Sequence, residues 1–200
     1  MLRSGVGGVN QLYCRLYCRL NLRLEKTGCS MGQNNFAESM LKGRMAETLF
    51  EELIRASGNI VYRFGYEAIV QNLTQLEEKF DRFSDVGKKV RSIPDFIVLD
   101  KRGKPLFVEV KFRYRPAAHA DDFERFNYVQ KTWDATLVLV NCWEQPYFRV
   151  AKPPYFDGKK QLQLKPLMSA SEWDIQKRVY DEYETLVHKY LTPTLVPKKS

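Results

Sequence analysis

The amino-acid sequence predicts an α/β fold in which helices flank a mixed β-sheet. The apolar residues of 36–56 follow helical spacing, and the stretch 94–112 has the alternation and the turn of a β-hairpin. A second helical pattern at 120–133 then precedes an apolar run at 136–142 that is typical of a buried strand. The order helix, strand, strand, strand, helix, strand indicates one sheet sandwiched between helices.

The first helix is expected to end at Ser57-Gly58-Asn59, because glycine and asparagine accept the left-handed conformation that closes helices. Glu51 and Glu52 of this helix are expected to be exposed to solvent. Residues 60–70 are rich in aromatic and β-branched side chains and are expected to form a strand. The polar stretch 71–92 is expected to contain a short helix and a loop inserted between strands.

Two strands, 94–100 and 106–112, flank the predicted turn Lys101-Arg102-Gly103. Because side chains alternate along a strand, one face of the hairpin is wholly apolar and the other carries Asp95, Glu109 and Lys111. If Asp100 pairs with Lys104, Asp95 faces Glu109 with Cβ atoms about 5 Å apart, where like charges destabilise a purely structural hairpin. A Mg²⁺ ion, which prefers oxygen ligands, would remove that repulsion. A solvated face with ordinary surface salt bridges is the alternative.

After the helix at 120–133, strands are expected at 136–142 and 147–151. A C-terminal helix over 171–191 is expected to open with Ser171 as its cap. Its apolar residues fit packing on the sheet or on a partner protein equally well. Residues 193–200 are interpreted as a tail.

Residues 1–30 are rich in arginine and leucine and contain one acidic residue. A targeting peptide, a surface-seeking amphipathic helix, a tail outside the fold, and translation from a start site before the natural one are all compatible with this pattern. The segment is treated as an N-terminal extension, and 31–192 as the domain.

The chain has 32 Lys and Arg against 24 Asp and Glu, a net charge of +8, which favours polyanionic partners such as nucleic acid. No apolar run approaches the ~18 residues that a membrane span requires, so no membrane partner is expected. The spacing of the four cysteines matches no compact zinc site, and a chain of this size with a good core does not need a disulfide framework. We therefore expect a reducing, cytoplasmic location, with organellar targeting by residues 1–30 left open.

Pro94-Asp95, thirteen further residues, and then Glu109-Val110-Lys111 resemble the signature of the PD-(D/E)xK nuclease superfamily. The helical segment Gly43-Arg44-Met45-Ala46-Glu47 is similar to the archaeal Holliday-junction-resolvase branch of that superfamily. The resemblance implies a restriction-endonuclease-like fold, an α-β-β-β-α-β core with a central mixed sheet flanked by helices, here with an added C-terminal helix.

The same resemblance implies a metal-dependent endonuclease that hydrolyses DNA phosphodiester bonds, with a structure-specific role in DNA repair or recombination. Mg²⁺, with Mn²⁺ as a substitute, would be held by Asp95, Glu109, the main-chain carbonyl of Val110 and Glu47. Lys111 and Gln130 would complete the catalytic set by orienting water or phosphate. A homodimer is a further expectation, since many nucleases of this kind are dimers.

Basic residues around the hairpin are the expected phosphate contacts, which position a substrate without reading its sequence. They are Lys88, Lys89, Arg91, Arg113 and Arg115. DNA is favoured over RNA as partner. The competing function is that of a non-catalytic nucleic-acid-binding or protein-interaction protein that retains the nuclease fold.

Overall fold

The computed structural model describes residues 31–65, 81, 83–118 and 122–192. The chain divides into two compact units, residues 1–41 and 42–200. Helix α2 (Met31–Ala56) begins in the first unit, and its residues from Lys42 onward belong to the second. The expectations for segments 1–30 and 193–200 concern residues outside the described ranges. No helix within those ranges is long and apolar enough to cross a membrane.

The described part of the larger unit is built on a six-stranded sheet in which the strands follow one another in chain order. Among the described strands only β3 and β4 run parallel to each other, so the sheet is mixed. The strands are β1 (Val61–Arg63), β2 (Phe96–Leu99), β3 (Pro105–Arg113), β4 (Thr136–Asn141), β5 (Phe148–Ala151) and β6 (Lys165–Pro166). The remaining elements are α4 (Asp85–Arg91), α5 (Asp122–Trp133), the 3₁₀ turn η2 (Leu167–Ser169) and α6 (Lys177–Leu191).

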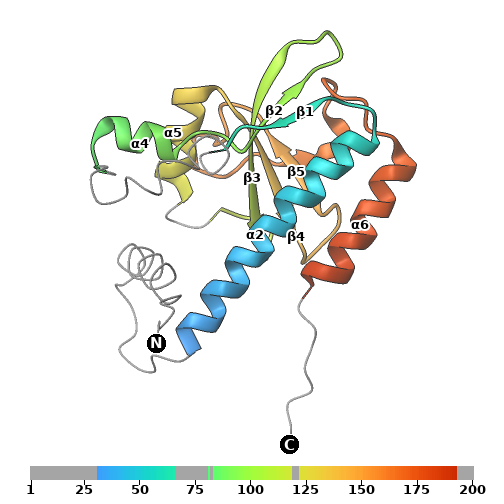
Figure 1. Ribbon diagram of the computed structural model, residues 1–200, viewed down its shortest axis with the longest axis horizontal. Helices are drawn as coiled ribbons and strands as arrows, with labels where there is room; N and C mark the ends of the chain where they lie inside the picture. The colour runs from blue at the N-terminus through green and yellow to red at the C-terminus, as the bar shows by residue number, and fades with distance from the viewer. Residues whose placement is uncertain (1–30, 66–80, 82, 119–121, 193–200) are drawn as a thin grey trace, which may run out of the picture. The chain divides into compact units, whose positions relative to one another are not determined.

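The predicted α-β-β-β-α-β order is confirmed as α2, β1, β2, β3, α5 and β4, with α4 inserted before β2. Parallel strands need a crossover connection, and α5 provides it between β3 and β4. Helices α2 and α6 cover one face of the sheet and α5 covers the other (Figure 1). Every residue of β4 is buried, which explains why its sequence reads as a continuous apolar run.

The C-terminal half of α2 supplies one side of the core through residues spaced three or four apart, Ala46, Phe50, Leu53 and Ile54, all fully buried. The helix closes as predicted. Gly58 takes a positive φ of 85°, and the Ser57 and Asn59 amides donate to the carbonyls of Leu53 and Ile54.

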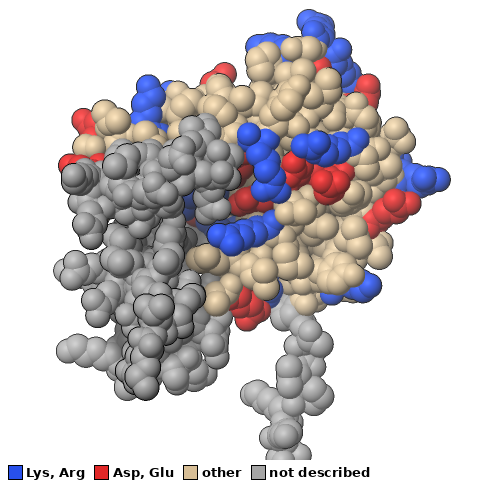
Figure 2. All heavy atoms as spheres, viewed as in Figure 1, with Lys and Arg blue, Asp and Glu red and all other residues tan. Residues whose placement is uncertain are grey.

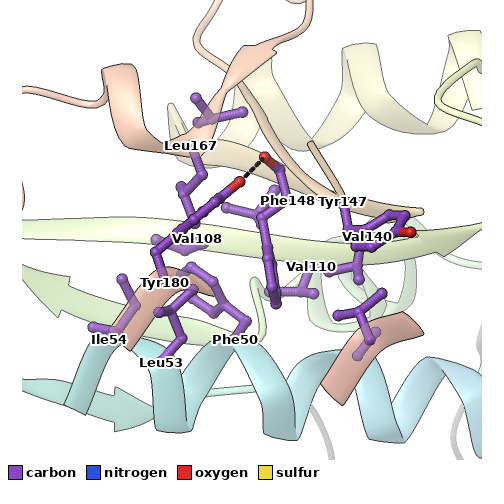
Figure 3. Packing of buried hydrophobic residues seen from close by; sticks show 14 of the residues in the cluster. Phe50, Leu53, Ile54, Val108, Val110, Val140, Tyr147, Phe148, Leu167 and Tyr180 are labelled. Atoms are coloured by element: carbon purple, nitrogen blue, oxygen red, sulfur yellow. Dashed lines mark hydrogen bonds between the residues drawn. The ribbon is translucent and has the colours of Figure 1, made fainter. Parts of the chain in front are cut away.

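Figure 3 shows α2 packed on the apolar face of the sheet and on α6. The Phe50 ring lies 5.7 Å from the Phe96 ring and 6.2 Å from that of Trp173. The α6 residue Tyr180 enters the same cluster and donates its hydroxyl proton to the Phe148 carbonyl at 3.4 Å. The apolar face predicted for the hairpin is therefore the face that forms this core.

The predicted start of the C-terminal helix at Ser171 is wrong. The helix begins at Lys177, after a non-helical segment in which Trp173 is buried. Hydrogen bonds hold that segment, among them those from the Lys101 amide to the Glu172 carbonyl and from the Asn59 side chain to the Asp174 carbonyl. Burying Trp173 against α2 outweighs the local helical preference of these residues.

The expected exposure of Glu51 is also wrong, whereas Glu52 is exposed. The Glu51 carboxylate accepts hydrogen bonds from Arg55, one turn later, at 2.9 Å and from Arg63 of β1 at 2.7 Å. Figure 2 shows basic and acidic side chains next to each other near the centre of the face that carries α2 and α6. Its charges are mixed rather than of one sign.

Candidate active site

The β2–β3 hairpin has the register that the sequence predicts. Phe96 pairs with Val108 and Leu99 with Pro105, which places Asp95 opposite Glu109. The Asp100 and Lys104 main chains pair at the turn, through a 2.8 Å hydrogen bond from the Asp100 amide. The two carboxylates therefore lie on the same face of the sheet, the one that α5 covers.

Asp95 is held on several sides. Its carbonyl accepts hydrogen bonds from the amides of Phe64 and Gly65, which follow β1, at 2.9 and 3.0 Å. Its carboxylate accepts a 2.7 Å hydrogen bond from the Val110 amide on β3. Gly65 passes so close that an added Cβ would lie 3.4 Å from the Asp95 Cα. Three strands of backbone thus fix the position of this one side chain.

The Lys111 ammonium lies between the two carboxylates. Its Nζ is 2.6 Å from Glu109 Oε1, 3.6 Å from Asp95 Oδ2 and 3.0 Å from the Val110 carbonyl oxygen. The Lys111 side chain is 14% exposed, and those of Glu109 and Asp95 are 6% and 20% exposed. A cation therefore occupies the point where the cross-strand repulsion is greatest.

Burial raises the pKa of Glu109 above its ordinary value and the Asp95 charge adds to this, while the charges of Lys111 and Arg125 act in the opposite direction. For Lys111, burial alone would lower the pKa, but Asp95 and Glu109 outweigh it and raise the pKa. Lys111 is consequently protonated, and it lies beside two carboxylates that repel each other.

The oxygens around the ammonium suit a hard cation. Asp95, Glu109 and the Val110 carbonyl offer only oxygen donors, as Mg²⁺ prefers, and converge on the space that Lys111 Nζ fills. Two carboxylates with one carbonyl leave the remaining positions of an octahedron to water and substrate, the usual arrangement for Mg²⁺ in proteins. The three predicted ligands on the hairpin thus fit the metal.

The structure does not bring Glu47 to this group. Within the described ranges, no three side chains of His, Cys, Asp or Glu lie close enough together to hold a metal ion. Helix α2, which carries Glu47, packs on the face of Val108 and Val110, whereas Glu109 and Lys111 point to the opposite face. We therefore leave Glu47 out of the proposed ligand set.

Gln130 lies on α5, on the same side of the sheet as the carboxylates. Its amide nitrogen donates to Asn127 Oδ1 at 2.6 Å, and its amide oxygen accepts from the Tyr155 amide at 2.8 Å. Tyr155 is fully buried beneath α5 and donates its hydroxyl proton to the Ala135 carbonyl. In this arrangement Gln130 anchors the segment after β5 to α5.

Arg113, one of the predicted phosphate contacts, also makes contacts within the fold. Its guanidinium forms an ion pair with the buried carboxylate of Asp122 on α5, donates to the Phe112 carbonyl at 2.7 Å, and lies 5.9 Å from the Phe126 ring centre. The side chain is 18% exposed. These contacts tie β3 to the start of α5.

The other predicted phosphate contacts are exposed: Lys88, Lys89, Arg91 and Arg115. The first three lie on α4, which leads directly into the Asp95 strand; of these, Lys88 lies 3.5 Å from Asp85 in a surface pair. Arg125, which the sequence reading missed, is exposed on α5 and close enough to Glu109 and Lys111 to affect the pKa of both. Arg125 lies one turn after Asp122 on a helix that faces the site, and this proximity can be recognised only from the fold.

No family model and no curated protein matches this sequence. Among solved structures, the fold is similar to that of Hjc, a Holliday junction resolvase from the archaeal hyperthermophile Archaeoglobus fulgidus. The sequences are 15% identical, the TM-score is 0.34, and the match covers 70% of this chain and 98% of the resolvase.

Proposed function

We propose that this protein is a Mg²⁺-dependent nuclease that hydrolyses phosphodiester bonds in DNA. The observation that carries the proposal is the convergence of Asp95, Glu109 and the Val110 carbonyl on one cation position filled by Lys111 Nζ. Structural ion pairs seldom place two carboxylates directly opposite each other on neighbouring strands, because that arrangement is destabilising without a cation. The site has the composition that phosphoryl transfer needs.

Hydrolysis joins the oxygen of a water molecule to phosphorus and breaks one P–O ester bond; the water loses a proton and the leaving oxygen gains one. A bound Mg²⁺ would lower the pKa of the attacking water and stabilise negative charge on the phosphate. Asp95, Glu109 and the Val110 carbonyl would hold the ion. Lys111, once displaced from the carboxylates, would neutralise charge that develops on the phosphate oxygens.

Substrate would be held electrostatically. Arg125 lies beside the carboxylate pair, and the exposed basic residues of α4 precede the Asp95 strand. Such contacts position a nucleic-acid backbone without reading its sequence. We further propose that the enzyme acts on particular DNA structures in repair or recombination.

The test is cleavage of labelled duplex, flap, four-way-junction and single-stranded DNA in Mg²⁺ and in EDTA. Asp95→Asn and Glu109→Gln should each lower the rate by at least about 100-fold, a loss comparable to that of one transition-state-stabilising group. Glu182→Gln is the matched control, because Glu182 is an exposed α6 carboxylate whose nearest cation, Arg178, is 3.9 Å away. Equal cleavage by wild type and both site variants would assign the activity to a contaminant and remove the basis of the proposal.

A further inference from the structure

The loops that follow the parallel strands β3 and β4 bring an aromatic pair and an arginine together on the surface. The Cys142 amide donates to the Tyr114 carbonyl at 3.4 Å and so joins the two loops. The Tyr114 and Trp143 ring centres are 5.3 Å apart, and the Arg115 guanidinium lies 4.5 Å from the Trp143 ring centre. We call Tyr114, Arg115 and Trp143 the Trp143 platform.

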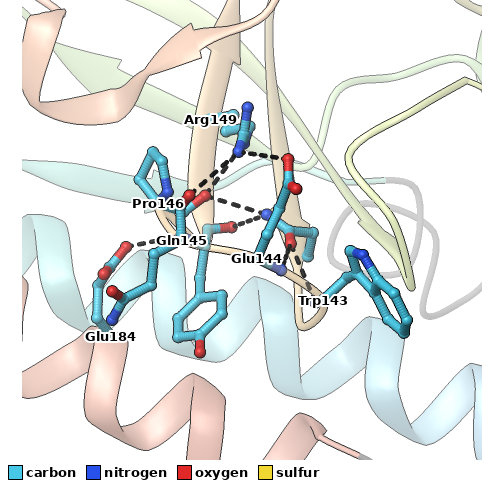
Figure 4. Close-up of polar contacts among 8 residues, drawn as sticks. Trp143, Glu144, Gln145, Pro146, Arg149 and Glu184 are labelled. Carbon is cyan, nitrogen blue, oxygen red and sulfur yellow. Dashed lines mark hydrogen bonds and ion pairs between the residues drawn. The ribbon is translucent and has the colours of Figure 1, made fainter.

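The loop that carries Trp143 is held by the Asn141 side chain at its base. The Asn141 amide oxygen accepts from the amides of Trp143 and Glu144 at 3.1 Å, and its nitrogen donates to the carbonyls of Pro146 and Tyr147. The Trp143 indole points away from this network (Figure 4). Polar contacts close to the backbone therefore order the loop without help from the indole.

Packing does not explain the aromatic residues of the platform. Trp143 is 51% exposed and Tyr114 is 43% exposed, although burial of such side chains is among the largest stabilising contributions to a fold. Arg115 is exposed as well, and its guanidinium covers one side of the indole. The cluster presents aromatic faces and a positive charge to the solvent, on a protein of net charge +8.

A flat aromatic face beside a cation is the combination that binds unpaired nucleotides. Bases stack on aromatic rings whatever their identity, and arginine contributes to both stacking and phosphate binding. Tyr114 is the first residue after β3 and follows Lys111 by three positions, a chain length of about 10 Å at the rise of a strand. That span corresponds to about three nucleotides at the rise of one DNA strand.

We infer that the Trp143 platform binds an unpaired base of the substrate next to the site of cleavage. The inference rests on the proposed nuclease function and specifies its substrate class, nucleic acid with single-stranded nucleotides such as a flap or a gap. In an uninterrupted duplex the bases are stacked on one another and offer the platform no free face. Single-stranded and gapped DNA should therefore bind more tightly than blunt duplex.

The test measures binding by fluorescence anisotropy in EDTA, so that cleavage does not enter. The probes are a labelled oligo(dT) of about 20 nucleotides, longer than most single-strand binding sites, and a blunt duplex of the same length. Trp143→Ala should weaken oligo(dT) binding by about 5- to 150-fold, the loss of one stacked base, and duplex binding by less than about threefold. Trp143→Phe, which keeps an aromatic face, should retain most of the affinity.

Tyr190→Ala is the matched control, since Tyr190 is also 51% exposed and has the Lys189 ammonium 4.8 Å from its ring centre, but lies on α6. Tyr190→Ala should change neither the affinity for oligo(dT) nor that for the duplex. As a second readout, oligo(dT) should quench tryptophan fluorescence in the wild type and much less in Trp143→Phe.

The outcomes separate this inference from the nuclease proposal. Equal losses on oligo(dT) and duplex, or unchanged oligo(dT) binding and quenching in the Trp143 variants, would overturn the platform while leaving cleavage at Asp95 and Glu109 untouched. Oligo(dT) binding that depends on Trp143 in a protein that cleaves no substrate would support the platform and refute the nuclease.

Discussion

Replacing Lys111 with methionine would remove the cation between Asp95 and Glu109 while keeping a side chain of similar length. Removal of one partner of a buried ion pair costs about 3–5 kcal/mol, because it leaves a buried charge without compensation. Asp95 is 20% exposed and can recover some hydration, so we expect the lower end, about 3 kcal/mol. For a folded unit of this size, that loss lowers the melting temperature by about 6–12 °C.

The loss should depend on pH. Burial and the Asp95 charge raise the pKa of Glu109, and Lys111 opposes them, so removing Lys111 raises that pKa further. A carboxyl group with a higher pKa in the folded than in the unfolded state destabilises the fold when charged. The loss of stability is therefore absent below the unfolded pKa of about 4.3. It grows as the pH rises above that value and is complete above the folded pKa.

Thermal melts in EDTA between about pH 5 and pH 8 would show this trend, with the full deficit at the upper end. Added Mg²⁺ should stabilise Lys111→Met more than the wild type, because in the wild type the ion must displace the ammonium. Lys177→Met is the control. It removes an exposed α6 ion pair with Asp181 and should cost less than about 1 kcal/mol. A Lys111→Met variant as stable as wild type at pH 8, with no larger Mg²⁺ shift, would refute the reasoning.

Four further predictions concern the two arginines after the β3 carboxylate, the binding of DNA and the core. Arg113→Ala should destabilise the fold by about 3 kcal/mol in chemical denaturation, because it removes the ion pair between β3 and the buried Asp122 carboxylate. Arg115→Ala should change the free energy of unfolding by less than about 0.5 kcal/mol, and it should reduce the salt dependence of DNA binding by about one phosphate contact. A large loss of stability in Arg115→Ala and none in Arg113→Ala would contradict the roles given to the two residues. With four exposed predicted contacts, the log–log slope of duplex binding against salt should be roughly −3 to −4, and a flat response would exclude phosphate binding. Phe50→Ala should cost about 3–5 kcal/mol in urea unfolding, since its ring is fully buried between Phe96 and Trp173; a cost below 1 kcal/mol would show that this cluster is loosely packed.

The sequence predicted the hairpin well because its information is local. Alternation fixes which side chains share a face, and the turn fixes the register, so the opposition of Asp95 and Glu109 follows from counting residues. The end of α2 at Gly58 was predictable for a similar reason, since the left-handed conformation favours glycine whatever surrounds it.

The errors fall where a partner distant in the chain decides the outcome. Arg113 was expected to contact substrate, and its ion pair with Asp122 on the following helix was not predicted. Glu51 has the spacing of an exposed helix residue, but Arg63 of β1 reaches it. The 171–176 segment could have continued α6, but Trp173 is required in the core. Such pairings cannot be read from periodicity, which describes one element at a time.

Arg125 and the pairing of Trp143 with Tyr114 were missed for a related reason. Arg125 is one of several charges on a polar helix face, and only the placement of α5 over β3 brings it beside Glu109. Trp143 and Tyr114 lie 29 positions apart, in two loops that meet because β3 and β4 are parallel neighbours.

The number of residues between each carboxylate and the turn at the tip of the β2–β3 hairpin determines which residue lies opposite Glu109. Five steps lead from Asp95 to Asp100 and five from Lys104 to Glu109, so the tip lies about 17 Å from the pair along each strand. One residue inserted before Asp100 that shifted the strand would turn Asp95 towards the core, and two would place another residue opposite Glu109. Changes in the length of exposed loops are usually mild for stability. Here the insertion of two residues at the exposed tip of the hairpin would keep the apolar face of β2 towards the core and still separate Asp95 from Glu109.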